Sequence, residues 1–140
     1  MHGPNLNLLG KREPEIYGTE GFDSFLEKLR VEYSQHNIVY FQSNIEGELV
    51  TALQNEGFSG LTDAIILNAA AYSHTSIAIA DAVKAIPIPV INVHLSNIYS
   101  REEVRHTDLI SKYAAGNING LGLFGYKAAL NFIIHNHSII

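Results

Sequence analysis

Two apolar runs and the helical segment between them constrain the fold of this chain more than any other feature. Ala64–Leu67 is a continuous apolar run, which is typical of a strand buried on both faces of a parallel sheet. Val90–His94 is a second β-rich run, and the spacing in Ser76–Ile86 predicts a helix that ends before Pro87 and Pro89. A strand, a helix and a strand in this order predict a right-handed parallel crossover.

The same alternation continues along the rest of the chain. We expect helices at 22–37, 45–55 and 126–136, strands at 38–41 and 118–121, and a charged helical turn at 101–106. Gly57 should stop the second of these helices, and Ser76 should cap the helix that it precedes. Together the elements predict an α/β fold, a doubly wound parallel sheet covered by helices on both faces in three layers. A length of 140 residues indicates one domain with one core.

The opening stretch, residues 2–18, has neither a strand nor a helix period, and its glycines and prolines predict a long loop. A doubly wound sheet opens with a strand that feeds the first loop. We therefore expect that strand to be missing or truncated before Met1. Within the loop, a guanidinium from Arg12 near Tyr17 would favour the phenolate and could make a general base. The alternative is a surface arginine and a half-buried tyrosine on an ordinary loop.

Composition and charge exclude several classes of function. The net charge of −5 disfavours nucleic acid as a partner, since nucleic-acid binding needs a basic footprint. The absence of cysteine excludes disulfides, thiolate metal sites and cysteine nucleophiles. No segment approaches the ~20 continuous apolar residues of a membrane span, and no signal peptide is visible, so we expect a cytoplasmic protein.

In a doubly wound sheet, ligands bind beyond the carboxyl ends of the strands. Those ends lead into four polar residues: Asn68, His74, His94 and Ser96. The opening loop should bring Asn5, Arg12 and Tyr17 to the same edge. Amides, hydroxyls, imidazoles and a guanidinium without a carboxylate pair predict a site for a small, oxygen-rich, anionic molecule.

Each of these residues also has a structural alternative. His94 could be a hydrogen-bonded structural histidine, and Asn68 could satisfy backbone groups of its loop. Arg101 and Arg105 could form a solvated helix face beside two glutamates. The pattern G-x-G-x-x-G at 120–125 lacks the acidic residue of a dinucleotide site and indicates close packing of a helix on a strand. Two histidines near the C-terminus lack a third ligand, so we expect no metal site.

Residues 3–18 read GPNLNLLGKREPEIYG, and this stretch resembles the signature loop of the type II 3-dehydroquinate dehydratases. Further matches follow in the same order at 42–48, 67–76, 93–97, 101–103 and 120–126. The resemblance covers essentially the whole chain. It implies a flavodoxin-like fold and a single dehydroquinase domain over 1–140, with residues 1–20 as an active-site lid. It also implies a lyase that converts 3-dehydroquinate to 3-dehydroshikimate and water, by anti elimination through an enolate, in the shikimate pathway or quinate catabolism.

The resemblance also implies roles for individual residues. Tyr17 would be the base, Arg12 would hold it as tyrosinate, Asn5 would position a water that stabilises the enolate, and His94 would protonate the departing hydroxyl. Substrate hydroxyls would bind Asn68, His74 and Arg105, and the carboxylate would bind Ser96 and the Leu95 backbone. Asp81 would reach the site of a neighbouring subunit in a dodecamer, a tetramer of trimers. No metal and no cofactor is implied.

One departure from the family concerns the acid. Asn92 stands where relatives carry a glutamate two residues before the acid histidine, and that carboxylate would orient the imidazole and favour its charged form. An amide carries no charge, so we expect a weaker acid at His94.

Two alternatives to an active dehydratase remain: a catalytically weakened or silent paralogue that keeps fold and assembly, and a flavodoxin-like module for a nucleotide or flavin. The second lacks phosphate-binding glycines or hydroxyls after its first strand. A lysine Schiff-base mechanism is disfavoured because the lysines fall on the lid or on polar helical stretches.

Overall fold

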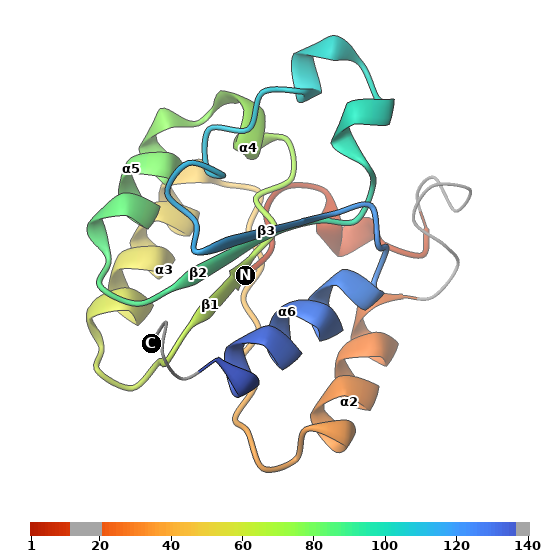
Figure 1. Cartoon of the computed structure of the whole chain (residues 1–140), viewed down its shortest axis with the longest axis vertical. Coiled ribbons are helices and arrows are strands. Elements are labelled where there is room, and N and C mark those ends of the chain that lie inside the picture. Colours follow the sequence, from red (N-terminus) through yellow and green to blue (C-terminus); the bar gives the residue numbers. More distant parts are fainter. Residues whose placement is uncertain (12–20, 137–140) are drawn as a thin grey trace.

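The computed structural model describes residues 1–11 and 21–136, which form three layers (Figure 1). The middle layer is a parallel sheet in the order β1 (Ile65–Leu67), β2 (Val90–His94) and β3 (Gly116–Asn119). Helices α3 (Glu46–Phe58) and α5 (Ile77–Ala85) cover one face of the sheet, and α2 (Phe22–Glu32) and α6 (Phe124–His135) cover the other. The short elements are η1 (Leu6–Leu8), α4 (Tyr72–Thr75), η2 (Ile98–Ser100) and η3 (Glu103–Arg105). Within the two described ranges, no helix has the length and apolar character needed to cross a membrane.

The first residues of the chain occupy an interior position of the sheet, between the segment 41–43 and β1. His2 forms parallel bridges to both Gln42 and Asn68. Its amide donates to the Phe41 carbonyl at 2.9 Å, and the Gly3 amide donates to the Asn68 carbonyl at 2.8 Å. The spatial order of extended segments is therefore 41–43, 1–3, β1, β2, β3, the 2-1-3-4-5 order of a flavodoxin-like sheet.

This arrangement corrects two predictions from the sequence. Residues 1–3 pair on both sides in the place of the first strand, so the alternative in which that strand is missing is wrong, whereas the alternative of a truncated strand agrees with these short bridges. The opening stretch is accordingly not a loop from residue 2 onward. Three residues are too few to carry a visible two-residue period, so only the backbone hydrogen bonds identify them as strand-like.

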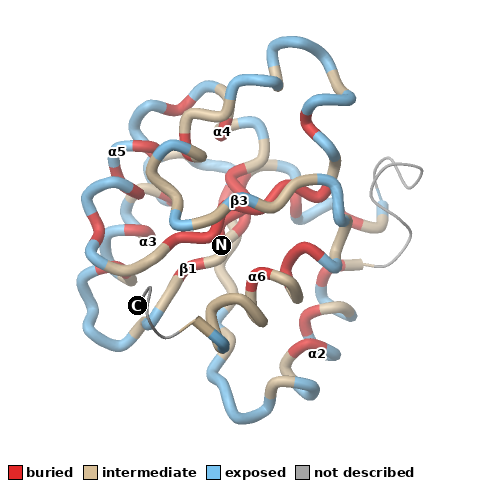
Figure 2. Tube along the Cα trace, viewed as in Figure 1, coloured by how far each residue is buried: buried red, intermediate tan, exposed pale blue. Residues whose placement is uncertain are grey.

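Alternate residues of the strands supply two separate cores. Ile65, Leu67 and Val90 pack with residues of α3 and α5, whereas Ile91 and Val93 pack with residues of α2 and α6. Figure 2 shows buried residues concentrated along β1 and β2 and on the inward sides of the helices. Because side chains alternate between faces, Asn92 and His94 share the Val90 face of β2.

Most predicted elements are confirmed, and their boundaries show where local signals were overridden. The prediction for β2 is correct at both ends, and Ser76 Oγ accepts from the Ile79 amide at 2.9 Å as the predicted cap. Helix α3 continues through Gly57 to Phe58, so Gly57 does not stop it. A Cβ at Gly57 would lie 2.5 Å from Ile86 Cγ2, so the glycine lets Ile86 pack against the helix. Strand β3 ends before Gly120, whose φ of +82° turns the chain there.

Gly3→Ala should destabilise the fold by about 3 kcal/mol, the upper end of the usual cost of overpacking. A Cβ at Gly3 would lie 2.4 Å from the Ala69 carbonyl oxygen, and backbone cannot move aside cheaply. Gly47→Ala in α3 is the matched control, since nothing lies within 4 Å of its added Cβ. The control should be neutral or stabilising by up to about 1 kcal/mol. Equal urea midpoints for both variants would contradict this packing.

Candidate active site

A crevice opens beyond the carboxyl ends of β1, β2 and residues 1–3, at the switch point of the sheet. Apolar, amide, hydroxyl and basic side chains line it: Leu6, Asn68, Ala70, Ala71, His74, His94, Leu95, Ser96, Ile98, Arg101 and Arg105. Two guanidiniums and two imidazoles face the same space, and the described lining residues include no carboxylate. This composition favours a small anionic ligand rich in hydroxyl or carbonyl groups.

The loop after β1 is held in shape by Asn68. Its Oδ1 accepts from the Ala70 amide at 3.1 Å, and its Nδ2 donates to the Tyr126 hydroxyl at 2.9 Å. Ala70 has a φ of +52°, a conformation that costs free energy in a residue with a Cβ. The structural alternative for Asn68 is thus confirmed, and the same residue also lines the crevice.

His94 is buried at the end of β2 and bonded to a carboxylate. Its Nε2 lies 2.9 Å from Asp108 Oδ2, and both side chains are about one-twentieth exposed (6% and 5%). The Asn92 amide, on the same face of β2, donates to the same oxygen at 2.7 Å. Asp108 Oδ1 accepts from the amides of Ile110 and Ser111, at 2.9 and 3.1 Å. Every oxygen of this buried carboxylate therefore has two donors.

These contacts set the charge state of Asp108. Burial alone would raise its pKa, but the hydrogen bond and charge of His94, with hydrogen bonds from Ser111 and Asn92, outweigh burial. The pKa consequently falls from 3.8 to about 2. Asp108 is a carboxylate throughout the neutral range, so Nε2 of His94 must be the ring nitrogen that donates to it.

Asp108 should therefore make folding acid-sensitive. Because its pKa is lower in the folded state, its stabilising contribution is present above about pH 4 and is lost as the pH falls through about 2. The lost contribution should be about 2 kcal/mol. Urea unfolding of the wild type and of Asp108→Asn, between pH 5 and pH 2, should show the two free energies converging by that amount. If the free energies of unfolding of the two proteins fell in parallel over this pH range, the lowered pKa of Asp108 would be contradicted.

His74 lies beside His94 in the crevice. The two rings are stacked, with centroids 5.6 Å apart and planes inclined by 20°. His74 Nδ1 donates to the Thr107 carbonyl at 2.8 Å, which leaves Nε2 as the ring's acceptor when it is neutral. Burial lowers the pKa of His74, and the charges of His94 and Arg105 act in the same direction, although the Thr107 bond and Asp108 oppose them.

The structure brings together six of the residues expected at the site: Asn68, His74, His94, Leu95, Ser96 and Arg105. Arg105 also donates to Glu102 Oε2 at 2.9 Å, so its guanidinium is held at the rim. Asn5 directly precedes the lining residue Leu6 and has a φ of +68°. Its backbone amide donates to Asn44 Oδ1. Asp81 is exposed on α5 and does not line the crevice. The predictions for Arg12 and Tyr17 lie outside the described residues.

Sequence reasoning missed Asp108 altogether and treated Arg101 only as a possible solvated face. A signal for Asp108 did exist. Asn92 stands at the centre of a strand whose five residues are all buried, and a buried amide needs polar partners. A carboxylate in the loop before β3 is such a partner. Asn92 itself carries no charge, but Asp108 places a carboxylate against His94 from a different element. The weaker acid expected at His94 was argued from residue 92 alone, and it stays a prediction.

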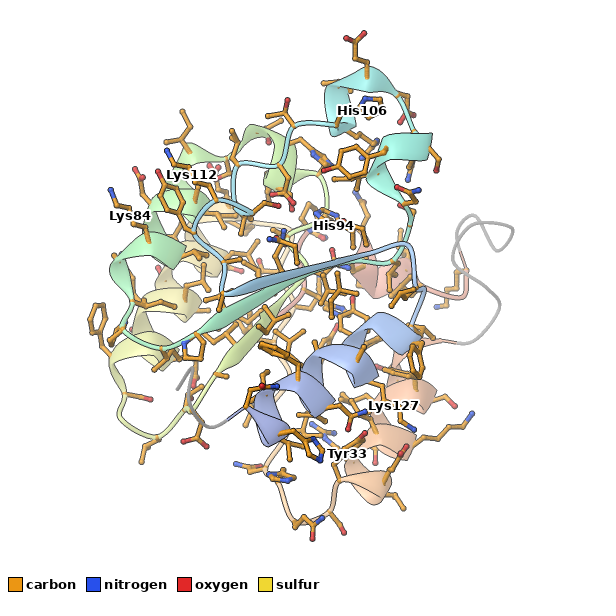
Figure 3. The ribbon with its side chains drawn as sticks, in the orientation of Figure 1. Tyr33, Lys84, His94, His106, Lys112 and Lys127 are labelled. Atoms are coloured by element: carbon orange, nitrogen blue, oxygen red, sulfur yellow. The ribbon has the colours of Figure 1, made fainter. Side chains whose placement is uncertain are left out.

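Neither a metal-ligand cluster nor a lysine in the crevice is found in the described parts of the chain. Over residues 1–11 and 21–136, no three His, Cys, Asp or Glu residues are grouped so that they could hold a metal ion. Figure 3 shows Lys84, Lys112 and Lys127 on the outside of the molecule, away from His94. The lining residues described above include no lysine that could form a Schiff base.

A 2-1-3-4-5 parallel sheet with a basic crevice at its switch point defines a flavodoxin-like α/β protein with a site for a small anionic molecule. Residues 1–134 match the family described as dehydroquinase class II, and the chain belongs to this family.

Relatives and solved structures agree with that assignment. The chain is 47% identical over 136 residues to a 3-dehydroquinate dehydratase of Prochlorococcus marinus, covering 96% of this chain and 92% of that one. It is 48% identical over 143 residues to a 3-dehydroquinate dehydratase of Bordetella avium, covering 97% and 95%. The crystal structure of a type II dehydroquinase from Butyrivibrio crossotus superimposes with a TM-score of 0.90 at 38% identity, covering 95% and 93%. The crystal structure of a type II dehydroquinase from Propionibacterium acnes superimposes with a TM-score of 0.87 at 40% identity, and the match covers 94% of this chain and 91% of that one.

Proposed function

We propose that this chain is a 3-dehydroquinate dehydratase, which removes water from 3-dehydroquinate to give 3-dehydroshikimate. One observation carries the proposal: a buried imidazole paired with a carboxylate faces a crevice lined by two arginines and an asparagine, in a member of the dehydroquinase class II family. The reaction would be an anti elimination through an enolate, without metal or cofactor, in the shikimate pathway or quinate catabolism.

His94 is suited to act as the general acid on the departing hydroxyl. Its Nε2 is engaged by Asp108, so Nδ1 is the nitrogen left for the substrate. A ring protonated on both nitrogens can donate from Nδ1 while Nε2 keeps its bond to the carboxylate. The leaving oxygen then departs as water rather than as hydroxide, which lowers the barrier to elimination.

The base would come from the lid. Tyr17, held as tyrosinate by Arg12, would take the proton beside the ketone, and Asn5 would place a water against the enolate oxygen. Exposure of Asn5 and its position directly before Leu6 are compatible with such a role.

The remaining residues would bind and orient substrate. Asn68, His74 and Arg105 would hold hydroxyls, and Ser96 with the Leu95 backbone would hold the carboxylate. Asp81, exposed on α5, would serve the site of a neighbouring subunit in a dodecamer built as a tetramer of trimers. We also propose that the enzyme is cytoplasmic, because its sequence shows neither an apolar run long enough to span a membrane nor a visible signal peptide.

The test is turnover of 3-dehydroquinate, followed by ultraviolet absorbance of the conjugated enone. We expect saturable enone formation, and no loss of activity when borohydride is added with substrate, since no described lining residue is a lysine. A folded chain that binds 3-dehydroquinate without forming the enone would instead be a silent paralogue. Inactivation by borohydride that depends on substrate would refute the proposed mechanism.

A further inference from the structure

The loop between η3 and β3 contributes a charge to the candidate active site that no expected site residue provides. Asp108 lies on this loop, fourteen positions after His94 in the chain, and its Oδ2 is 2.9 Å from His94 Nε2. We propose that Asp108 is the positioning residue of His94: it fixes the ring tautomer, directs Nδ1 to the substrate and balances the charge of the protonated ring. This role rests on the proposed function, in which His94 is the general acid.

The hydrogen-bond inventory of the carboxylate supports a fixed geometry. Backbone amides of Ile110 and Ser111 bind one oxygen, so the carboxylate plane cannot rotate without losing both bonds. The other oxygen receives Asn92 Nδ2 and His94 Nε2. A carboxylate anchored to the backbone in this way holds the imidazole at a set angle.

The role of Asn92 follows from its own partners. Its Nδ2 reaches Asp108 Oδ2 at 2.7 Å and Asn117 Oδ1 at 3.1 Å, so both amide hydrogens have acceptors. The reverse orientation of the amide would bring Asn92 Oδ1 against two acceptor oxygens. Asn92 is thus a neutral donor that orients Asp108, and within residues 1–11 and 21–136 Asp108 is the carboxylate that is bonded to His94.

The charged surroundings explain why an anion is needed at this point. The groups that share the crevice with His94 are His74, stacked on its ring, and the guanidiniums of Arg101 and Arg105. The two guanidiniums are cationic, and the described residues that line the crevice include no carboxylate to balance them. Asp108 is the described carboxylate that opposes them by direct contact with the ring.

The experiment compares the wild type with Asp108→Asn, using Asp63→Asn at an exposed carboxylate as the control for net charge. With 3-dehydroquinate as substrate, Asp108→Asn should lower kcat about 10- to 100-fold with KM within about twofold. The alkaline limb of its kcat profile should move to lower pH. The control should match the wild type in all three quantities. A folded Asp108→Asn protein with kcat within threefold of the wild type overturns the proposal.

A second measurement does not depend on activity. In nitrogen-15 NMR of the full chain with labelled histidine, neutral wild-type His94 should carry its proton on Nε2. The Asp108→Asn variant should show a mixture of tautomers. A wild-type His94 protonated on Nδ1 alone overturns the proposal even if the variant does not fold. If wild-type His94 shows the Nε2 tautomer but the protein never forms the enone, the result refutes the proposed function. It would still support the proposal that Asp108 fixes the tautomer of His94.

Discussion

His94→Gln should lower kcat by about 10²- to 10⁴-fold while KM stays within about threefold, as expected for loss of a general acid. Glutamine can place its amide nitrogen near the position of Nε2, so the bond to Asp108 Oδ2 can persist. The substitution removes Nδ1 and with it the proton for the departing hydroxyl. The fold should be retained because the buried carboxylate keeps a donor.

Steady-state kinetics of enone formation measure the effect, with His36→Gln as the matched control at an exposed turn after α2. A further readout separates the steps. His94→Gln should still exchange the proton beside the ketone with deuterated water, because enolate formation precedes loss of the hydroxyl. Turnover within fivefold of the wild type would remove His94 from the role of acid.

The sequence was sufficient to predict the part of the fold that depends on local patterns. The β-rich run Val90–His94 predicts both ends of β2, and Ser76, a preferred residue type at a helix start, predicts the cap that the structure shows. The rule that ligands bind beyond the carboxyl ends of parallel strands then placed His94 and Ser96 at one crevice.

Contacts between distant segments could not be predicted in the same way. The strand role of His2 depends on backbone bonds to residues some 40 and 66 positions away, and no period in three residues reveals them. Helix α2 ends at Glu32, before the predicted boundary, and the chain beyond it turns toward the segment that pairs with His2. Asp108 reaches His94 because the loop before β3 folds back over β2, which is a tertiary outcome.

Two residues, Tyr17 and His74, are candidates for the base of the proposed mechanism. Among the described residues that line the crevice, only the imidazoles of His74 and His94 could accept a proton from carbon. The half-buried Tyr40 and the buried Tyr126 are unsuited, because burial raises the pKa of Tyr40 to about 12 and raises that of Tyr126 further. His74 is thus the rival to Tyr17, since its lowered pKa keeps it neutral and its Nε2 is an acceptor.

Tyr17→Phe should lower kcat by at least about 10³-fold with KM nearly unchanged, because it removes the base and leaves the binding groups in place. It should also abolish exchange of the proton beside the ketone, which His94→Gln preserves. Tyr99→Phe, at a tyrosine 64% exposed on η2, is the matched control and should be silent. His74→Gln should raise KM about tenfold, as for loss of a hydrogen bond of about 1.4 kcal/mol, and keep the exchange. The opposite pattern, with exchange lost in His74→Gln and kept in Tyr17→Phe, would assign the base to His74.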